Sequence, residues 1–382
     1  MLRYLTAGES HGRALVALVD GFPAGVDLKV EAINAELVRR QGGYGRGGRQ
    51  TIETDHVEVL SGVWRGVTLG SPIALLIPNK DFKIDQMEDL DRPRPGHGDL
   101  SGSIKYLTSV RAILERASAR ETTTRVAAGA LAKQLLAPLG ITAFAYVVQV
   151  GELPIPPKPG EIEEQRAWRD RSITSTLDPD RDPQVAELID RCKQAGDTLG
   201  GIVEIRVEGL PYGLGTHTQW DKKLDGRLAQ AVMAVQAMKG VEIGMGFQAA
   251  RTPGSQVHDP IQFDPNKTHT RSLGFTRTHN NAGGLEAGMT NSQPLVLRVA
   301  MKPISTLAKP LESVNLQTKQ SESASYERSD VCAVAAASCI LENVVAFEIA
   351  CAVVEKFGGD NLEEIKQRLD LFYEMARKML NE

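Results

Sequence analysis

Strand-like and helix-like segments follow one another along this chain of 382 residues in an irregular order. Short apolar runs bounded by Gly, Pro or Asp, or alternating with polar residues, predict strands at Val16–Val19, Val57–Leu60, Ile73–Ile77, Ile202–Glu208 and Leu295–Met301. Apolar residues at helical spacing predict helices at Glu31–Arg40, Glu121–Leu136, Leu224 to near Gly240, and Leu362–Met379. Because this order is neither a regular strand–helix alternation nor a succession of strands, we expect an α+β fold in which antiparallel or mixed sheets pack against helices.

The chain is long enough for one large domain or two ordinary ones. A proline-rich segment, Leu153–Pro159, opens a polar and charged stretch, but the segments on either side of that stretch resemble each other. We therefore expect a single domain over residues 1–382, with residues 152–198 forming a surface insertion.

Composition and charge exclude several classes of protein. The chain is 42% hydrophobic and 24% charged, as in soluble globular proteins, and its net charge of −4 argues against a nucleic-acid-binding surface. The longest uncharged helix-like run, Val331–Leu341, is too short to cross a bilayer, so we expect no membrane association. The four cysteines form no Cys-x-x-Cys pair, which favours buried thiols in a cytoplasmic protein over disulfides or zinc.

Glycine is enriched, with 36 residues, and is concentrated in a few loops. The densest is Arg39–Arg49, which holds four arginines, five glycines and no acid. Glycines let backbone N–H groups approach an anion, and guanidinium groups bind carboxylate or phosphate, so this loop is a candidate anion site. Its Gly-x-Gly-x-x-Gly pattern follows a helix, which argues against a dinucleotide fold. An RGG-type RNA-binding segment and a solvated loop remain alternatives.

Two further glycine-flanked loops each contain one histidine. Gly8–Gly12 matches the Gly-x-Ser-x-Gly motif of hydrolases, but only seven residues precede it, too few for the sheet that such an elbow requires. His11 in this loop and His97 in Arg92–Asp99 are candidate proton donors. Either histidine alone could be structural.

Three more segments are candidates for ligand binding. Glu115–Thr122 leads into a helix N-terminus that suits a phosphate or the edge of a planar cofactor, although an ordinary cap is the alternative. Thr278–Gln293 is polar, small and glycine-rich, which is typical of a loop wrapped around a ligand. Asp330 precedes a long apolar helix and is either a site residue or that helix's N-cap.

Taken together, eight ordered motifs resemble those of the chorismate synthase family, and the resemblance covers nearly the whole chain. They are Gly8–Gly12, Arg39–Arg49, Arg94–His97, Ser118–Thr122, Lys239–Gly244, Asn281–Gly284, Lys302–Thr306 and Arg328–Asp330. The resemblance implies a β-α-β sandwich and a homotetramer. It also implies the anti-1,4-elimination of phosphate from 5-enolpyruvylshikimate 3-phosphate to give chorismate, with reduced FMN and no net redox change.

The resemblance also implies roles for individual residues. For His97 it implies protonation of the departing phosphate, for His11 protonation of the reduced flavin, and for Asp330 deprotonation of flavin N5 with support from Ser10 and Ser118. The substrate-binding residues that the resemblance implies are Ser10, Arg40, Arg46, Arg49, Arg94 and Arg120. FMN-binding residues are Arg116, Ala117, Ser118, Gln236, Ala237, Ala287, Lys302, Pro303, Ile304, Ser305, Thr306 and Arg328.

Some features depart from the family pattern or leave the reductant open. Ala117 stands where many relatives have Ser, Ala287 where a glycine pair is common, and Val331 where Pro follows the aspartate. Because no dinucleotide site is visible, we expect an external flavin reductase or reductant, with NADPH acting only indirectly. The alternative is a bifunctional enzyme that also reduces flavin with NADPH.

Overall fold

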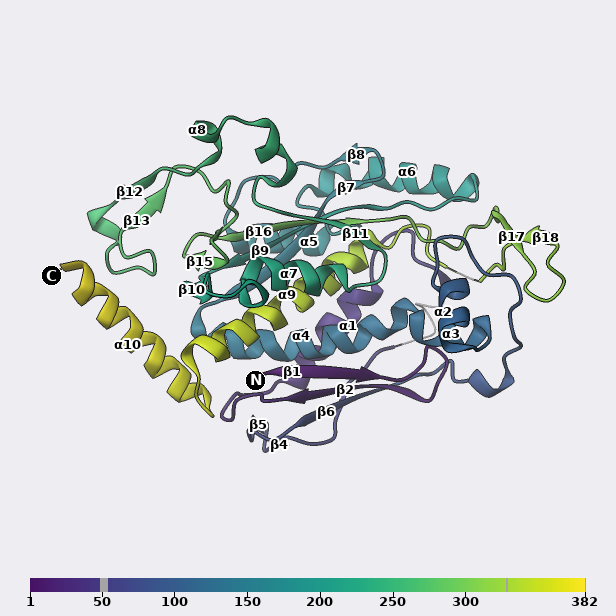
Figure 1. Ribbon diagram of the computed structural model, residues 1–382, viewed down its shortest axis with the longest axis horizontal. Helices are drawn as coiled ribbons and strands as arrows, with labels where there is room; N and C mark the ends of the chain where they lie inside the picture. The colour runs from purple at the N-terminus through teal and green to yellow at the C-terminus, as the bar shows by residue number, and fades with distance from the viewer. Residues whose placement is uncertain (49–53, 328, 382) are drawn as a thin grey trace.

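Two antiparallel sheets form the outer layers of the protein, whose computed structural model describes residues 1–48, 54–327 and 329–381 (Figure 1). The first sheet has the order β1-β2-β6-β3. Its strands are β1 (Arg3–Ala7), β2 (Ala14–Asp20), β6 (Ile73–Pro78) and β3 (Glu58–Val59). Alternate residues of β2 and β6, such as Leu15, Ala17 and Leu75, are buried against the interior, as expected for a sheet with one solvated face.

The second sheet has the order β11-β16-β9-β7-β8 and is antiparallel throughout. Its strands are β7 (Thr142–Val150), β8 (Leu153–Pro154), β9 (Gly201–Glu208), β11 (Met238–Ile243) and β16 (Leu295–Met301). Strand β16 pairs along its whole length with the central strand β9, from Gly201 opposite Met301 to Val207 opposite Leu295.

Three helices fill the space between the sheets (Figure 1). They are α1 (Val30–Gln41), α4 (Thr122–Leu136) and α9 (Val334–Phe357). Helices α4 and α9 cross so closely that a Cβ atom on Gly129 would collide with the main chain of Asn343. Helix α9 is long and apolar enough to span a bilayer, yet 89% of its most apolar window is buried inside the protein, as in a core helix. The fold is thus the expected α+β sandwich of sheet, helices and sheet.

The remaining elements are shorter or lie outside this sandwich. The strands are β4 (Val63–Trp64), β5 (Val67–Thr68), β10 (Tyr212–Gly215), β12 (Ile261–Phe263), β13 (Phe275–Arg277), β14 (Leu285–Glu286), β15 (Met289–Asn291), β17 (Glu312–Val314) and β18 (Ser321–Ser323). The helices are α2 (Asp99–Tyr106), α3 (Val110–Ala117), α5 (Ile162–Arg171), α6 (Asp182–Gln194), α7 (Leu224–Met233), α8 (Gly254–Val257) and α10 (Leu362–Asn381). The 3-10 turns are η2 (Ile84–Gln86), η3 (Ala119–Glu121), η4 (Ala137–Leu139), η5 (Pro179–Arg181), η6 (Trp220–Lys222), η7 (Gly246–Arg251) and η8 (Pro265–Lys267).

The helix that begins at Leu224 and the segment 152–198 differ in how they compare with the sequence expectations. The helix expected to run to near Gly240 ends at Met233, and Gly240 lies in β11 opposite Ala300. The expectation was wrong because residues 238–243 form backbone hydrogen bonds with β16, which override the helical spacing that precedes them. Residues 152–198 form α5 and α6, and Val185 and Ile189 of α6 are buried in the main hydrophobic core.

Candidate active site

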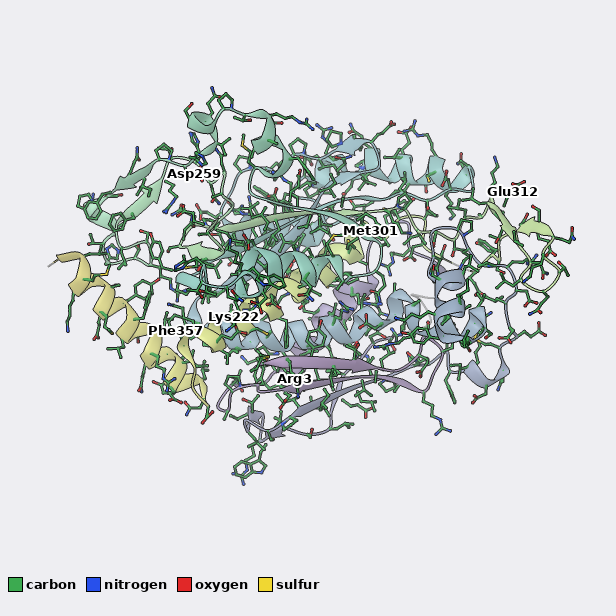
Figure 2. All side chains as sticks on the ribbon, viewed as in Figure 1. Arg3, Lys222, Asp259, Met301, Glu312 and Phe357 are labelled. Carbon is green, nitrogen blue, oxygen red and sulfur yellow. The ribbon has the colours of Figure 1, made fainter. Side chains whose placement is uncertain are left out.

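Loops from both halves of the sandwich meet around a cavity of about 950 Å³. Met301, labelled in Figure 2 at the end of β16, lies on its wall. The cavity brings together many of the predicted site residues: Ser10, His11, Arg40, Arg46, Arg94, His97, Ala117, Ser118, Arg120, Gln236, Ala237, Lys302, Ile304, Ser305, Thr306 and Asp330. Residues far apart in the sequence therefore line one cavity.

Five other predicted residues do not line this cavity or cannot be placed. Arg49 and Arg328 lie outside the described residues. Pro303 and Ala287 are absent from the described cavity wall, as is Arg116. The Arg116 guanidinium instead donates to the main-chain oxygens of Thr6, at 2.8 Å, and Gly8, at 3.0 Å, and so fixes the end of β1. The roles of all five stay predictions.

The polar segment Thr278–Gln293 has a different position from the one expected. None of its residues, all of which are described, contributes to the cavity wall. A glycine of this segment allows the main chain to pass close to residue 244, because a Cβ atom on Gly283 would collide with the main chain of Gly244. The side chain of Asn280 donates to Pro294 O at 2.8 Å and so closes the same crossing. None of this segment lines the cavity, and its role in wrapping around a ligand stays a prediction, as does that of Ala287 within it.

His97 is held by a carboxylate on one ring nitrogen. Its Nδ1 lies 2.5 Å from Asp99 Oδ1, and Arg94 Nε donates to Asp99 Oδ2 at 2.8 Å. Burial alone would raise the pKa of the Asp99 carboxyl, but hydrogen bonds from His97 and Arg94 outweigh it and hold the pKa well below its usual range. An ionised Asp99 fixes the orientation of the imidazole through Nδ1, and the other ring nitrogen, Nε2, lies 3.3 Å from Arg94 Nη2.

His11 has the same arrangement in a separate loop. Its Nδ1 lies 2.9 Å from Glu115 Oε1, and its main-chain N–H donates to Glu115 Oε2 at 2.8 Å. Burial would raise the pKa of the Glu115 carboxyl, but the hydrogen bonds from His11 lower it below its usual value. Asp81 Oδ2 lies 3.8 Å from Nε2. Two carboxylates, Glu115 and Asp81, therefore flank this imidazole.

Two arginines share one buried carboxylate. Asp55 is 1% exposed, and both its oxygens accept hydrogen bonds from Arg120 Nη1, at 2.6 and 2.8 Å. Arg40 Nη1 lies 3.6 Å from Asp55 and makes no hydrogen bond within the described part of the chain. Burial lowers the pKa of the Arg40 guanidinium to about 10, so it remains charged at neutral pH. A buried cationic donor without a hydrogen bond, facing a cavity, suits an anionic ligand.

Asp330 binds the Arg/Gly loop rather than capping a helix. Its Oδ1 accepts the main-chain N–H of Gly47 at 2.6 Å, and its Oδ2 lies 3.2 Å from Arg46 Nε. Helix α9 begins at Val334 with Ala333 in the cap position, so the N-cap alternative is wrong. The residues between Asp330 and the helix pair with other segments instead: Val331 N–H donates to Gly45 O at 2.8 Å, and Cys332 forms a β-bridge with Leu199.

Residues 152–198 support the other side of the same loop. Ile173 O accepts the main-chain N–H of Tyr44 at 2.8 Å, and Asp190 accepts the Tyr44 hydroxyl at 3.0 Å. A second cavity, of about 630 Å³, lies between the loop and α6, and Arg46 and Asp330 line both cavities. The segment that sequence reasoning left without a role therefore positions the arginine-bearing loop.

Replacing Gly45 with alanine should disturb this loop. Gly45 has φ +85°, and a Cβ atom there would lie 2.9 Å from Ile189 Cγ2 and 3.1 Å from Cys332 Cβ. We expect a loss of about 1–2 kcal/mol from the left-handed backbone alone, together with weaker binding of inorganic phosphate. Urea unfolding and calorimetry measure both effects. The control is Gly226→Ala on α7, where a Cβ atom meets nothing within 4 Å; equal stability of the two variants would contradict the prediction.

Sequence reasoning missed the partners that hold these groups. Glu115 and Asp99 lie within segments already singled out. The position of Asp99 two residues after His97 was an available signal, whereas Glu115 reaches His11 only across 104 residues of sequence. Asp55, Asn79 and Asp81 carried no such signal, because they reach the site only through long-range contacts. In the described residues, no three His, Cys, Asp or Glu side chains are grouped so that they could hold a metal ion.

Buried arginines and two carboxylate-bound histidines around one cavity are typical of an enzyme that acts on a small anion. Comparison with known proteins identifies which enzyme class this is. The family model described as chorismate synthase matches residues 2–354. The chain belongs to the chorismate synthase family and is a lyase.

Individual relatives agree over nearly their whole length. Chorismate synthase from Geobacter metallireducens is 51% identical, and the alignment covers 99% of this chain and 100% of the relative. The protein of the same name from Bacillus cytotoxicus is 49% identical over the same shares. A solved structure titled as the crystal structure of chorismate synthase is 41% identical, with a TM-score of 0.81, and covers 99% of this chain and 98% of its own.

Proposed function

We propose that this chain eliminates phosphate from 5-enolpyruvylshikimate 3-phosphate to give chorismate, in an anti-1,4-elimination that needs reduced FMN without net redox change. The observation that carries the proposal is the convergence of Arg40, Arg46, Arg94 and Arg120 with two carboxylate-bound histidines on one cavity. A substrate with two carboxylates and a phosphate requires several guanidinium groups in one place. The volume of about 950 Å³ is at the upper end for ligand sites and suits a substrate and a cofactor together.

His97 acts on the departing phosphate in this proposal. The C–O bond to phosphate breaks with its electron pair on oxygen. A C–H bond breaks elsewhere on the ring, its hydrogen leaves as a proton and its electron pair stays in the ring. The existing ring double bond shifts, and a conjugated diene results. A proton held at His97 Nε2 would neutralise charge on the leaving phosphate, while Asp99 orients the ring through Nδ1. Arg94 Nη2, 3.3 Å from Nε2, adds positive charge beside the same oxygen atoms.

The residues around Gln236 fit a flavin. Gln236 Nε2 donates to Glu121 at 3.1 Å, while its Oε1 is buried without a hydrogen bond in the described part of the chain. Ala117 and Ala237 on the same wall are small, which leaves room for a planar ring. Bound reduced FMN would supply transient electron density that eases C–O cleavage. Residues of this wall would hold it: Ala117, Ser118, Gln236, Ala237, Lys302, Ile304, Ser305 and Thr306.

An anaerobic assay tests the proposal. The purified chain is mixed with the substrate and chemically reduced FMN, and released phosphate is measured. We expect phosphate and chorismate in equal amounts, and no release when the FMN is oxidised. Absence of phosphate release with reduced FMN would overturn the proposed function.

We further infer a cytoplasmic homotetramer that depends on an external flavin reductant. All four cysteines are unpaired thiols, which suits a reducing compartment. Leu5 and Leu18 on the outer face of the first sheet are 63% and 40% exposed, which suits burial between subunits. Light scattering measures the assembly. An assay with oxidised FMN and NADPH alone tests the bifunctional alternative, for which we expect no turnover.

Replacing Asp330 with asparagine should separate its charge from its structural contact. Asparagine keeps an oxygen acceptor for the Gly47 N–H but removes the negative charge beside Arg46. If Asp330 takes part in proton transfer, kcat should fall by about 10²-fold while the melting temperature stays near that of the wild type. Unchanged kcat would mean that Asp330 only holds the loop.

A further inference from the structure

Asn79 connects two parts of the active site although its own side chain is not part of the described cavity wall. It follows β6 directly and is 8% exposed. Its Nδ2 donates to the main-chain oxygens of Glu9, Ser10 and Gly12, at 3.2, 3.3 and 2.8 Å. Its Oδ1 accepts the Nε–H of Arg120 at 3.0 Å.

Chemistry fixes the orientation of this amide. An arginine Nε–H can only donate, so the atom that faces it must be Oδ1, and main-chain carbonyls can only accept, so the atom that faces them must be Nδ2. A reversed amide would place donor against donor and acceptor against acceptor. The Asn79 side chain therefore joins the Gly8–Gly12 loop to the guanidinium of Arg120 in one arrangement.

The two groups that Asn79 joins come from distant parts of the chain and act on the same ligand space. Ser10 and His11 lie on the loop, and Arg120 lies in η3 before α4; all three line the cavity. On its far side, Arg120 is held by Asp55. Without Asn79, the Nε–H of Arg120 would lose its acceptor, and the loop would lose the donor to its three carbonyls.

We propose that Asn79 is a positioning residue that sets the distance between the Arg120 guanidinium and the His11 loop. This inference rests on the proposed function, because Arg120 would bind the anionic substrate while Ser10 and His11 act beside it. Loss of the Arg120 contact should weaken anion binding. Loss of the contacts to the loop should instead lower kcat. A small displacement of the catalytic groups on the loop slows the reaction even when the substrate binds as tightly as before.

Two substitutions separate these contacts. Asn79→Asp keeps an oxygen acceptor for Arg120 but removes the N–H donors to the loop, whereas Asn79→Ala removes both. The matched control is Asn343→Ala. Asn343 is also a buried amide, and its Nδ2 donates to Glu36 Oε2 at 2.7 Å and Cys339 O at 2.8 Å, away from the cavity wall.

The experiment measures kcat and KM by phosphate release with reduced FMN, the dissociation constant of inorganic phosphate by calorimetry, and the melting temperature. For Asn79→Ala we expect kcat to fall and KM to rise, each by about tenfold or more, and phosphate to bind at least about fivefold more weakly. For Asn79→Asp we expect the same loss of kcat with KM and phosphate binding within about threefold of the wild type. Asn343→Ala should lower the melting temperature and leave the other three quantities unchanged.

The outcomes distinguish this inference from the proposed function. Wild-type chain that releases no phosphate contradicts the function, and the phosphate dissociation constants then decide the role of Asn79. If wild type turns over but Asn79→Ala stays within twofold in kcat and KM, the inference is wrong. It is also wrong if Asn343→Ala shows the same changes. If Asn79→Ala does not fold, Asn79→Asp provides the test. A lower kcat with a nearly unchanged KM supports the inference, and an unchanged kcat contradicts it.

Discussion

Replacement of His97 by alanine should lower kcat by about 10²-fold or more, the usual contribution of a general acid. Phosphate is a poor leaving group when fully charged, and His97 Nε2 is the ring nitrogen that the Asp99 contact leaves available. The substitution leaves Arg94 in place, because Asp99 still accepts its Nε–H at 2.8 Å. Substrate and flavin should therefore bind with nearly wild-type affinity, as titrations with substrate and with oxidised FMN would measure.

Two companion variants sharpen this prediction. Asp99→Asn keeps the side-chain shape but weakens control over the His97 tautomer, so its kcat should lie between those of wild type and His97→Ala. His217, an exposed histidine after β10, provides the control, and His217→Ala should leave kcat unchanged. Wild-type turnover in His97→Ala would remove this residue from the mechanism.

Local patterns predicted most of the fold and the loops of the site. Strands β2, β6, β9 and β16 and helix α4 were visible because their apolar spacing agrees with their final environment. The end of α7 could not be predicted from the local sequence, because the pairing of Gly240 with Ala300 depends on a strand some sixty residues away. Asp330 illustrates the same limit: its sequence position suits a cap, but its partner is the Gly47 N–H.

The arginines of the site are paired with acidic residues, which the predicted cationic site did not include. Each arginine on the cavity wall lies beside an aspartate: Arg94 beside Asp99, Arg46 beside Asp330, and Arg40 and Arg120 beside Asp55. The sequence showed the arginines in glycine-rich loops but not these acids as their partners, since ion pairs between distant segments leave no local pattern. A guanidinium group has five N–H donors, so one side can bind aspartate while another binds the ligand. The acids fix the arginines before the substrate arrives, which reduces the entropy lost on binding.

Glu342→Gln should cause the largest loss of stability away from the site. Glu342 is 3% exposed in the middle of α9, where its carboxylate meets Arg39 at 3.0 Å and Arg169 at 3.1 Å, as well as Lys133. Removing one partner of a buried ion pair leaves uncompensated charge, and here several cations lose a partner at once. We expect the free energy of unfolding to fall by about 3–5 kcal/mol, measured by urea denaturation.

The same residue predicts how stability depends on pH. Burial would raise the pKa of the Glu342 carboxyl, but Arg39, Lys133 and Arg169 outweigh it and hold the pKa far below its usual value. A carboxyl with a lowered folded-state pKa stabilises the protein above its unfolded pKa of about 4.3, and this contribution is lost as the pH falls further toward the folded pKa. The unfolding free energy of wild type should therefore fall more steeply below about pH 5 than that of Glu342→Gln. Glu36 contacts the same Lys133 and also has a lowered pKa. Because the charge of Glu342 raises the pKa of Glu36, the difference between the two proteins reports on both carboxylates together.

A partly exposed carboxylate provides the comparison for Glu342. Glu355 pairs with Arg227 at the surface, with 42% of its side chain exposed, and Glu355→Gln should cost less than about 1 kcal/mol. Folded Glu342→Gln should keep a wild-type kcat, because Glu342 is not part of the described cavity wall. If the two variants were equally stable, the buried cluster would contribute no more than a surface pair, and Arg39 and Arg169 would have to be stabilised by other groups.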